Sequence, residues 1–257
     1  MNMNIVKENV FKPFDMMVME EALESIGKTL ARDFNEIKHI NFEKREKFIE
    51  RFENRTINFI INLLHQKRLD YGIITKSMMF QEEAESKWII NLLDGRENFL
   101  RGIGVFCCAI AVMKNNEIVS SMILDPMNSD LFAADEKGVF LNYRKVYVSK
   151  NVEIEKSMFG LNQNINNPNI KQRKLGSTLL NMAYVANGKL DGCIERPTHL
   201  CDYAAGLALV KKVDNGLVSV RKDKKISELP LDNDLLDLPS DLICSNEKLH
   251  DYLKKSI

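Results

Sequence analysis

The residues with the clearest chemical potential are two aspartates placed at the ends of apolar segments. Asp94 follows an apolar run that begins at Trp88, and Gly95 comes directly after it. Asp202 precedes Ala204-Ala205-Gly206, small residues that permit close backbone approach at a helix N-terminus. Carboxylate oxygens are the hard ligands that Mg²⁺ requires. The first pattern predicts a carboxylate able to hold a metal ion, and the alternative is an Asp94 that only caps a turn or a helix start.

Two helical segments and a series of short strands are predicted to position these residues. Apolar residues recur at helical spacing over residues 7–34 and 44–66, which predicts a long helical hairpin with core-facing Met and Phe residues. After residue 70, short apolar or alternating runs predict strands over 71–75, 88–93, 102–113, 118–124, 138–141, 190–195 and 217–220.

The connections and later helices carry their own signals. Asn115-Asn116 predicts a hairpin turn, because Asn tolerates positive φ. Residues 162–172, with five Asn and a Pro, predict an exposed loop or a joint between subdomains. Further helices are predicted over residues 176–188, from Asp202 to Val213 and over 247–255.

Composition limits the class of protein. The 257 residues suffice for one large α/β domain or two closely joined ones. Lys+Arg and Asp+Glu both number 36, so net charge does not indicate nucleic acid. The apolar runs are too short to span a bilayer, and the first residues lack a signal-peptide pattern. Five cysteines without a C-x-x-C pair predict reduced, mostly buried thiols in a cytoplasmic protein.

The stretch 88–99 resembles the first metal-binding signature of the inositol monophosphatase family, Trp-x-x-Asp-Pro-x-Asp-Gly-Thr-x-Asn-Phe. Other pieces follow in the family's order and cover nearly the whole chain: Leu124-Asp125-Pro126, 131–134, 138–142, 173–177, 183–188 and 201–206, the last similar to Trp-Asp-x-Ala-Ala-Gly. The resemblance implies an α/β (α+β) fold, a layered αβαβα sandwich of the sugar-phosphatase type with an N-terminal helical hairpin. Residues 1–150 would hold the hairpin and a mixed sheet with the first motif, and 151–257 an α/β unit with the second.

The resemblance also implies a Mg²⁺ site and a role for each residue in it. Active members use two or three Mg²⁺ to activate water and stabilise the leaving group. Asp94 and Asp202 are the candidate catalytic residues. The candidate substrate contacts are Gly95, Glu195 and Ala204, although a lone Glu near a strand end is a nearly equal interpretation. The candidate metal-binding set is Asp94, Asp202, Asn91, Leu93 and Glu82.

Several of these positions depart from the family pattern. Asn91 replaces an Asp, and Arg96 replaces a Thr that positions the nucleophilic water. The metal-binding Glu that follows the family's Tyr-Gly strand becomes Lys76 in the register we favour, whereas the alternative register uses Glu82 or Glu83. Lys47, together with Lys44, stands in an upstream segment where the family often has a Thr and an outer Asp.

These exchanges remove negative charge and add positive charge. A few ångströms from a divalent ion, each unit of charge is worth several kcal/mol at an effective dielectric constant of about 20. We therefore hypothesise that Arg96 and Lys76 neutralise Asp94 and Asp202 through internal ion pairs.

Two functions follow from the resemblance. The leading one is a family-fold protein with a depleted Mg²⁺ site and little or no catalysis, acting by binding a ligand or a protein partner such as the transcription machinery. The alternative is a Mg²⁺-dependent phosphatase for inositol monophosphate or a related small phosphate ester, using Asp94, Asp202, Glu82 and the amide oxygen of Asn91. A homodimer is compatible with both, because family members are often dimers.

Overall fold

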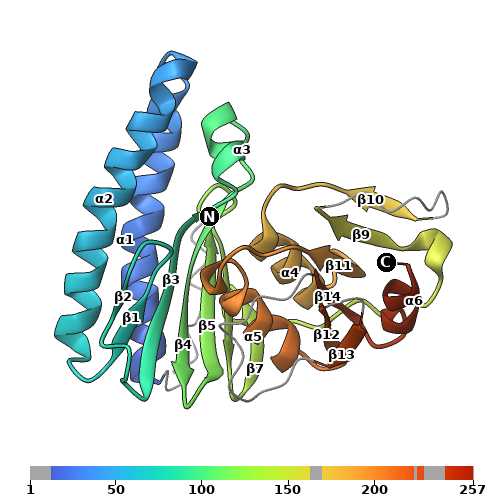
Figure 1. Cartoon of the computed structure of the whole chain (residues 1–257). Coiled ribbons are helices and arrows are strands. Elements are labelled where there is room, and N and C mark those ends of the chain that lie inside the picture. The colour runs from blue at the N-terminus through green and yellow to red at the C-terminus, as the bar shows by residue number, and fades with distance from the viewer. Residues whose placement is uncertain (1–12, 163–169, 223–224, 229–240, 257) are drawn as a thin grey trace, which may run out of the picture.

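The chain forms five layers of alternating helices and sheets (Figure 1). The computed structural model describes residues 13–162, 170–222, 225–228 and 241–256. Helices α1 (Phe14–Ile37) and α2 (Phe42–Lys67) cover one face of an eight-stranded sheet, and α4 (Thr178–Ala186) and α5 (Ala204–Lys212) lie between this sheet and a six-stranded one. Helix α6 (His250–Lys255) packs on the outer face of the second sheet. The layered sandwich with an N-terminal hairpin is confirmed.

The hairpin forms because each helix carries an apolar stripe. The buried residues of α1 recur every three or four positions, as in Met19, Leu23, Ile26, Leu30, Phe34 and Ile37. They pack on the first sheet together with Ile49, Phe52, Ile60 and Leu64 of α2. The predicted hairpin is confirmed, except that residues 7–12 of the first predicted helix lie outside the described residues.

The first sheet has the strand order β2-β1-β3-β4-β5-β6-β7-β8. Its strands are β1 (Gly72–Ile74), β2 (Met79–Phe80), β3 (Ser86–Asp94), β4 (Cys107–Lys114), β5 (Glu117–Asp125), β6 (Asp130–Asp135), β7 (Gly138–Leu141) and β8 (Arg144–Lys145). Strand β1 runs parallel to β3, and the other neighbours are antiparallel. Asn115 and Asn116 have φ of 48° and 64° between β4 and β5, which confirms the predicted turn.

The strand predicted over residues 102–113 begins later than expected. Helix α3 (Arg96–Arg101) precedes it and ends at Gly102, whose φ of 75° is a left-handed conformation that glycine adopts readily. Residues 103–106 then form a loop, and β4 starts at Cys107. Apolar character alone did not separate the loop from the strand.

The second sheet has the order β10-β9-β11-β14-β12-β13. Its strands are β9 (Met158–Leu161), β10 (Lys171–Arg173), β11 (Gly192–Glu195), β12 (Gly216–Lys222), β13 (Lys225–Glu228) and β14 (Asp241–Asn246). Strand β9 lies parallel to both β10 and β11. The interpretation of residues 162–172 as a joint between subdomains is wrong, because β9 and β10 on either side of it belong to one sheet; residues 163–169 lie outside the described residues.

The middle helical layer shares one core with both sheets. Buried residues of α4 and α5 pack against Ile89 and Ala111 on one side and Cys193 and Leu242 on the other. Gly206 lets the two helices approach closely, since a Cβ there would lie 2.7 Å from Sδ of Met182. The division of the chain at residue 150 stays a prediction. Across the described segments, no helix is both long and apolar enough to cross a membrane.

Candidate functional site

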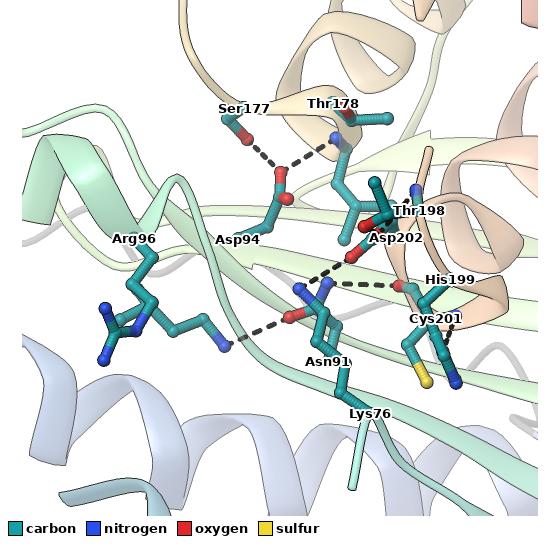
Figure 2. Close-up of polar contacts among 12 residues, drawn as sticks. Lys76, Asn91, Asp94, Arg96, Ser177, Thr178, Thr198, His199, Cys201 and Asp202 are labelled. Atoms are coloured by element: carbon teal, nitrogen blue, oxygen red, sulfur yellow. Dashed lines mark hydrogen bonds and ion pairs between the residues drawn. The ribbon is translucent and has the colours of Figure 1, made fainter. Parts of the chain in front are cut away.

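Four segments distant in sequence meet at the carboxyl end of β3 (Figure 2). They are the end of β3 itself, the connection after β1, the N-terminus of α4 and the 3₁₀ turn Leu200–Asp202 before α5. The pairing of β3 with β4 is interrupted between Asn91 and Asp94. Such irregularities redirect side chains, and here the interruption lies within the first motif.

Lys76 and Asp202 form an ion pair. The Nζ atom of Lys76 lies 2.6 Å from Oδ1 of Asp202, whose other oxygen accepts the backbone N–H (3.1 Å) and the hydroxyl (3.0 Å) of Thr198. Burial alone would raise the pKa of Asp202, but Lys76 and Thr198 lower it below its ordinary value. Burial would lower the pKa of Lys76, yet Asp202 and the nearby charge of Asp94 raise it. Both groups are therefore charged at neutral pH.

Asp94 is bound to the start of α4. Its Oδ2 atom accepts the Ser177 hydroxyl and the backbone N–H of Leu179, the latter at 3.0 Å. Ser177 is also the N-cap of α4, since its oxygen accepts the backbone N–H of Leu180 at 3.2 Å. Burial raises the pKa of Asp94, and these hydrogen bonds and Lys76 only partly offset that rise. The carboxylate joins the first motif to a helix N-terminus, where negative charge is stabilised.

Asn91 uses its amide as a bridge. The Nδ2 atom donates to the carbonyl of Cys201 at 3.1 Å, and the Oδ1 atom accepts the backbone N–H of Leu93 at 3.2 Å. The side chain is almost fully buried. A carboxylate at this position could not donate to the Cys201 carbonyl. The Asn91 side chain therefore links β3 to the turn that carries Asp202.

Arg96 does not neutralise Asp94, and that part of the ion-pair hypothesis is wrong. Its guanidinium points away from Asp94 toward α2 (Figure 2), where Nη1 lies 2.7 Å from Glu46 and Nε lies 3.4 Å from Glu53. The reason is local. Gly95 has φ of 82° and caps α3, so Arg96 begins a new helix that faces α2.

Two other predicted site residues lie on the surface. Glu82 is exposed, as is Glu83, in the turn after β2. Lys47 is exposed on α2. It precedes Asn54 by seven residues, which is about two helical turns, so the two residues lie on the same side of that helix. Lys76, the residue given by the register that we favoured, is the one that lies beside Asp202.

Glu195 and Ala204 are both fully buried. Glu195 accepts hydrogen bonds from Asn162 (2.8 Å), Thr178 (2.9 Å) and Asn181 (2.7 Å). Burial raises the pKa of Glu195 well above its ordinary value. Ala204 is fully buried at the first position of α5. Neither placement tests the predicted substrate contacts.

The described residues contain no group of three or more His, Cys, Asp or Glu arranged to hold a metal ion. A Mg²⁺ ion needs several oxygen ligands at about 2.1 Å in octahedral geometry. Oδ2 of Asp94, both carboxylate oxygens of Asp202 and Oδ1 of Asn91 accept hydrogen bonds or an ion pair from the protein itself. As arranged, these oxygens are engaged by donors of the protein itself.

Sequence reasoning missed residues that complete the site. Ser177 and Thr198 bind the two aspartates, and Glu46 and Glu53 bind Arg96. The spacing of seven residues between Glu46 and Glu53 places both on one face of α2, which was a usable signal. The two hydroxyl partners had no such signal: Ser177 lies 83 residues from Asp94 in sequence, and Thr198, four residues before Asp202, is not part of a spacing pattern.

The sequence and the fold both match known proteins. A family model described as "Inositol monophosphatase family" matches residues 13–256. The chain is 27% identical to an inositol-1-monophosphatase of Mesorhizobium japonicum, covering 93% of this chain and 94% of that protein. It is 29% identical to Nus factor SuhB of Xylella fastidiosa, covering 93% of each. The crystal structure of the extragenic suppressor protein suhB from Bartonella henselae superposes with a TM-score of 0.81 at 26% identity, covering 95% of this chain and 98% of that one.

Proposed function

Because the chain belongs to the inositol monophosphatase family, we propose that it acts by binding a ligand or partner, with little or no Mg²⁺-dependent hydrolysis. The observation that carries the proposal is the Lys76–Asp202 ion pair at 2.6 Å. An ammonium group at this distance occupies space next to the carboxylate and supplies its counter-charge. A divalent ion would have to displace Lys76 before it could bind Asp202.

The other motif residues support the same proposal through their roles in the fold. Asp94 holds the N-terminus of α4, and Asn91 holds the turn before α5. Each contact joins segments that are more than eighty residues apart. These interactions give both residues a structural role that requires no metal.

The proposal is tested by titrating the full chain with Mg²⁺ and Mn²⁺ in a calorimeter and by measuring phosphate release from inositol 1-phosphate. We expect neither metal binding at millimolar concentration nor release above background. Mg²⁺-dependent release at the rate of an active family member, measured in parallel, would overturn the proposal.

The phosphatase remains the second candidate, supported by a different observation. The Lys76 side chain is 50% exposed, so it could rotate away from Asp202 without disturbing the core. Relatives named inositol-1-monophosphatase cover almost the whole chain. Under this alternative the same calorimetric titration shows metal binding, and Asp202→Asn abolishes both the heat and the phosphate release.

The relatives named Nus factor SuhB support binding to a protein partner. Proteins named Nus factor SuhB match this chain over as much as 93% of its length. We propose the transcription machinery as the partner on this basis. The test is co-purification of the full chain with transcription complexes from its own source, where enrichment of Nus factors is expected and their absence would contradict this form.

A further inference from the structure

A cleft of about 350 Å³ lies between the two helices of the N-terminal hairpin, which run side by side on one outer face of the molecule (Figure 1). Helix α2 contributes residues at helical spacing, and α1 contributes residues from its last turns. The lining consists of Phe48, Arg51, Phe52 and Arg55 from α2 and of Arg32, Asp33 and Glu36 from α1. Its volume is within the range of small-molecule sites, which begins at about 300 Å³.

This cleft is separate from the candidate functional site. Glu53, which binds Arg96, lies on α2 two residues from both Arg51 and Arg55. Successive residues of an α-helix are turned by about 100°, so a separation of two residues turns Glu53 by about 200°. The cleft of the hairpin therefore lies on the side of α2 opposite to the residue that binds Arg96.

The lining of the cleft carries a net positive charge. Three guanidinium groups and two carboxylates line it, which leaves one positive charge. Asp33 is buried and engaged, because its Oδ1 atom accepts Nε (2.8 Å) and Nη2 (2.6 Å) of Arg32 and its Oδ2 atom lies 3.4 Å from Nη2 of Arg55. Glu36 is 56% exposed and lies 3.9 Å from Nε of Arg32, so its side chain can turn into water when an anion approaches.

Most N–H groups of the three guanidinium groups remain available. A guanidinium has five, and the contacts with Asp33 use two of those of Arg32 and one of those of Arg55. Arg51 is exposed and, within the part of the chain that the structure describes, forms no ion pair. Asp33 therefore orients two of the cations, and a site whose cations are already oriented loses less entropy on binding.

Two aromatic side chains form the apolar part of the lining. Phe52 is almost fully buried, and Phe48 is partly buried against the core of the hairpin. Apolar side chains exclude water, and charges interact more strongly where the local dielectric constant is lower. The carbon atoms of a ligand can contact Phe48 while its charged oxygens reach the arginines.

We infer that the cleft between α1 and α2 binds a small organic anion with at least two negative charges, through Arg32, Arg51 and Arg55. Di- and tricarboxylates and organic phosphates share this chemistry, because a guanidinium matches two oxygens of either group. The binding uses no divalent cation. The inference goes beyond the proposed function, since it concerns a second site and holds whether or not the protein hydrolyses an ester.

The experiment is calorimetric titration of the full chain in EDTA with citrate, succinate, glycerol 3-phosphate and acetate. We expect the first three to bind, acetate to bind at least about tenfold more weakly than citrate, and added salt to weaken all binding. Tighter binding of citrate and succinate assigns the site to organic acids. Tighter binding of glycerol 3-phosphate assigns it to phosphate esters, and both results support the inference.

Variants of the lining locate the site and give changes of opposite sign. Arg51→Gln and Arg55→Gln each remove one cation and should weaken citrate binding about tenfold. Both side chains are exposed, and Arg51 forms no ion pair within the described residues, so its variant should fold normally. Glu36→Gln removes a carboxylate and should strengthen binding about threefold, which a merely destabilised variant would not do. Lys67→Gln is the matched control, because it removes a cation at the other end of α2, and it should leave binding unchanged.

Three outcomes overturn the inference. The first is that none of the three multiply charged probes binds at millimolar concentration. The second is that Lys67→Gln weakens binding as much as Arg51→Gln, which would show a general effect of net charge. The third is that Lys76→Gln abolishes binding while Arg51→Gln and Arg55→Gln do not, which would place the anion at the end of β3. None of these decides the proposed function, which is tested by Mg²⁺ titration and phosphate release, so the two failures are distinguishable.

Discussion

The Lys76–Asp202 ion pair stabilises the charged form of each partner, and this has a defined pH signature. The pKa of Asp202 is lowered in the folded protein, so its contribution to stability is present above the unfolded-state pKa and is lost as pH falls through the folded value. The pKa of Lys76 is raised, so its contribution is present below the unfolded-state pKa and is lost as pH rises through the folded value.

Lys76→Gln should therefore lower the free energy of unfolding only over a bounded pH range. Unfolded Asp and Lys titrate near pH about 3.9 and about 10.4, so the difference from wild type is largest between these values and shrinks below and above them. Urea unfolding at acidic, neutral and strongly alkaline pH measures it. A difference of equal size at all three pH values would show that lost packing, not charge, is the cause.

A charge reversal at the same position tests whether Lys76 takes the place of a metal ion. Lys76→Glu puts a carboxylate beside Asp202, so we expect lower stability without metal and a melting temperature that rises by several degrees with saturating Mn²⁺. Thermal melting with and without Mn²⁺ measures this. Lys47→Glu, an equal change of charge on the exposed surface of α2, should show no such rise. An unresponsive Lys76→Glu variant would argue against the idea.

The two substituted cations show what sequence could and could not predict about the site. Lys76 could be placed because it follows a recognisable strand at a fixed distance. The direction of Arg96 could not be predicted, because it depends on the left-handed Gly95 and on the distance to α2. The spacing of residues along the chain predicts where the backbone of a residue lies. It does not predict which partner a long side chain such as that of Arg96 contacts.

Among the elements, α4 has the most direct influence on the site. Its N-cap Ser177 binds the N-terminal turn of the helix and Asp94 at once. Through Asp94, the helix positions the end of β3. Destabilisation of the N-terminus of α4 should therefore also destabilise the end of β3 in the first sheet.

Ser177→Ala removes both interactions and should destabilise the protein by about 1–3 kcal/mol, since it deletes a cap and leaves a buried carboxylate with one donor fewer. Chemical unfolding gives the magnitude, and amide exchange locates it. We expect faster exchange in the first turn of α4 and at the end of β3. Ser177→Thr keeps a hydroxyl and should lose less. Equal losses in the two variants would assign the effect to side-chain size.

Helices and strands with a regular spacing of apolar residues were predictable from the sequence. Strands that combine apolar residues with glycine or polar residues were not. The hairpin of α1 and α2 followed from its apolar stripes. Strands β9 and β14 were missed, because Met158–Leu161 contains a glycine and Asp241–Asn246 begins and ends with polar residues. Both strands are extended because neighbouring strands pair with them, which is tertiary information that a short segment does not contain.

The whole molecule is organised around the helical layer that both sheets share. Core residues from the first sheet, the middle helices and the second sheet belong to one buried cluster. Two units joined only by a linker would each have a core of their own. The shared cluster couples the unfolding of the two halves.

We expect one cooperative unfolding transition despite the two sheets. Trp88, the single tryptophan, is buried between the hairpin and the first sheet and so reports on that half by fluorescence, whereas far-UV circular dichroism reports on all elements. The two signals should change at the same urea concentration. Fluorescence that changes clearly before or after the dichroism would instead support independent units on either side of residue 150.

The bond between Asp94 and α4 also bears on how such motifs persist in evolution. A carboxylate that anchors a helix is under selection for folding, whether or not the protein catalyses a reaction. Loss of catalysis would then leave Asp94 and Gly95 in place while neighbours such as Asn91 and Arg96 diverge. Within such a lineage, retention of Asp94 reflects its role in the fold. The identities of the residues around it indicate better whether the catalytic chemistry is retained.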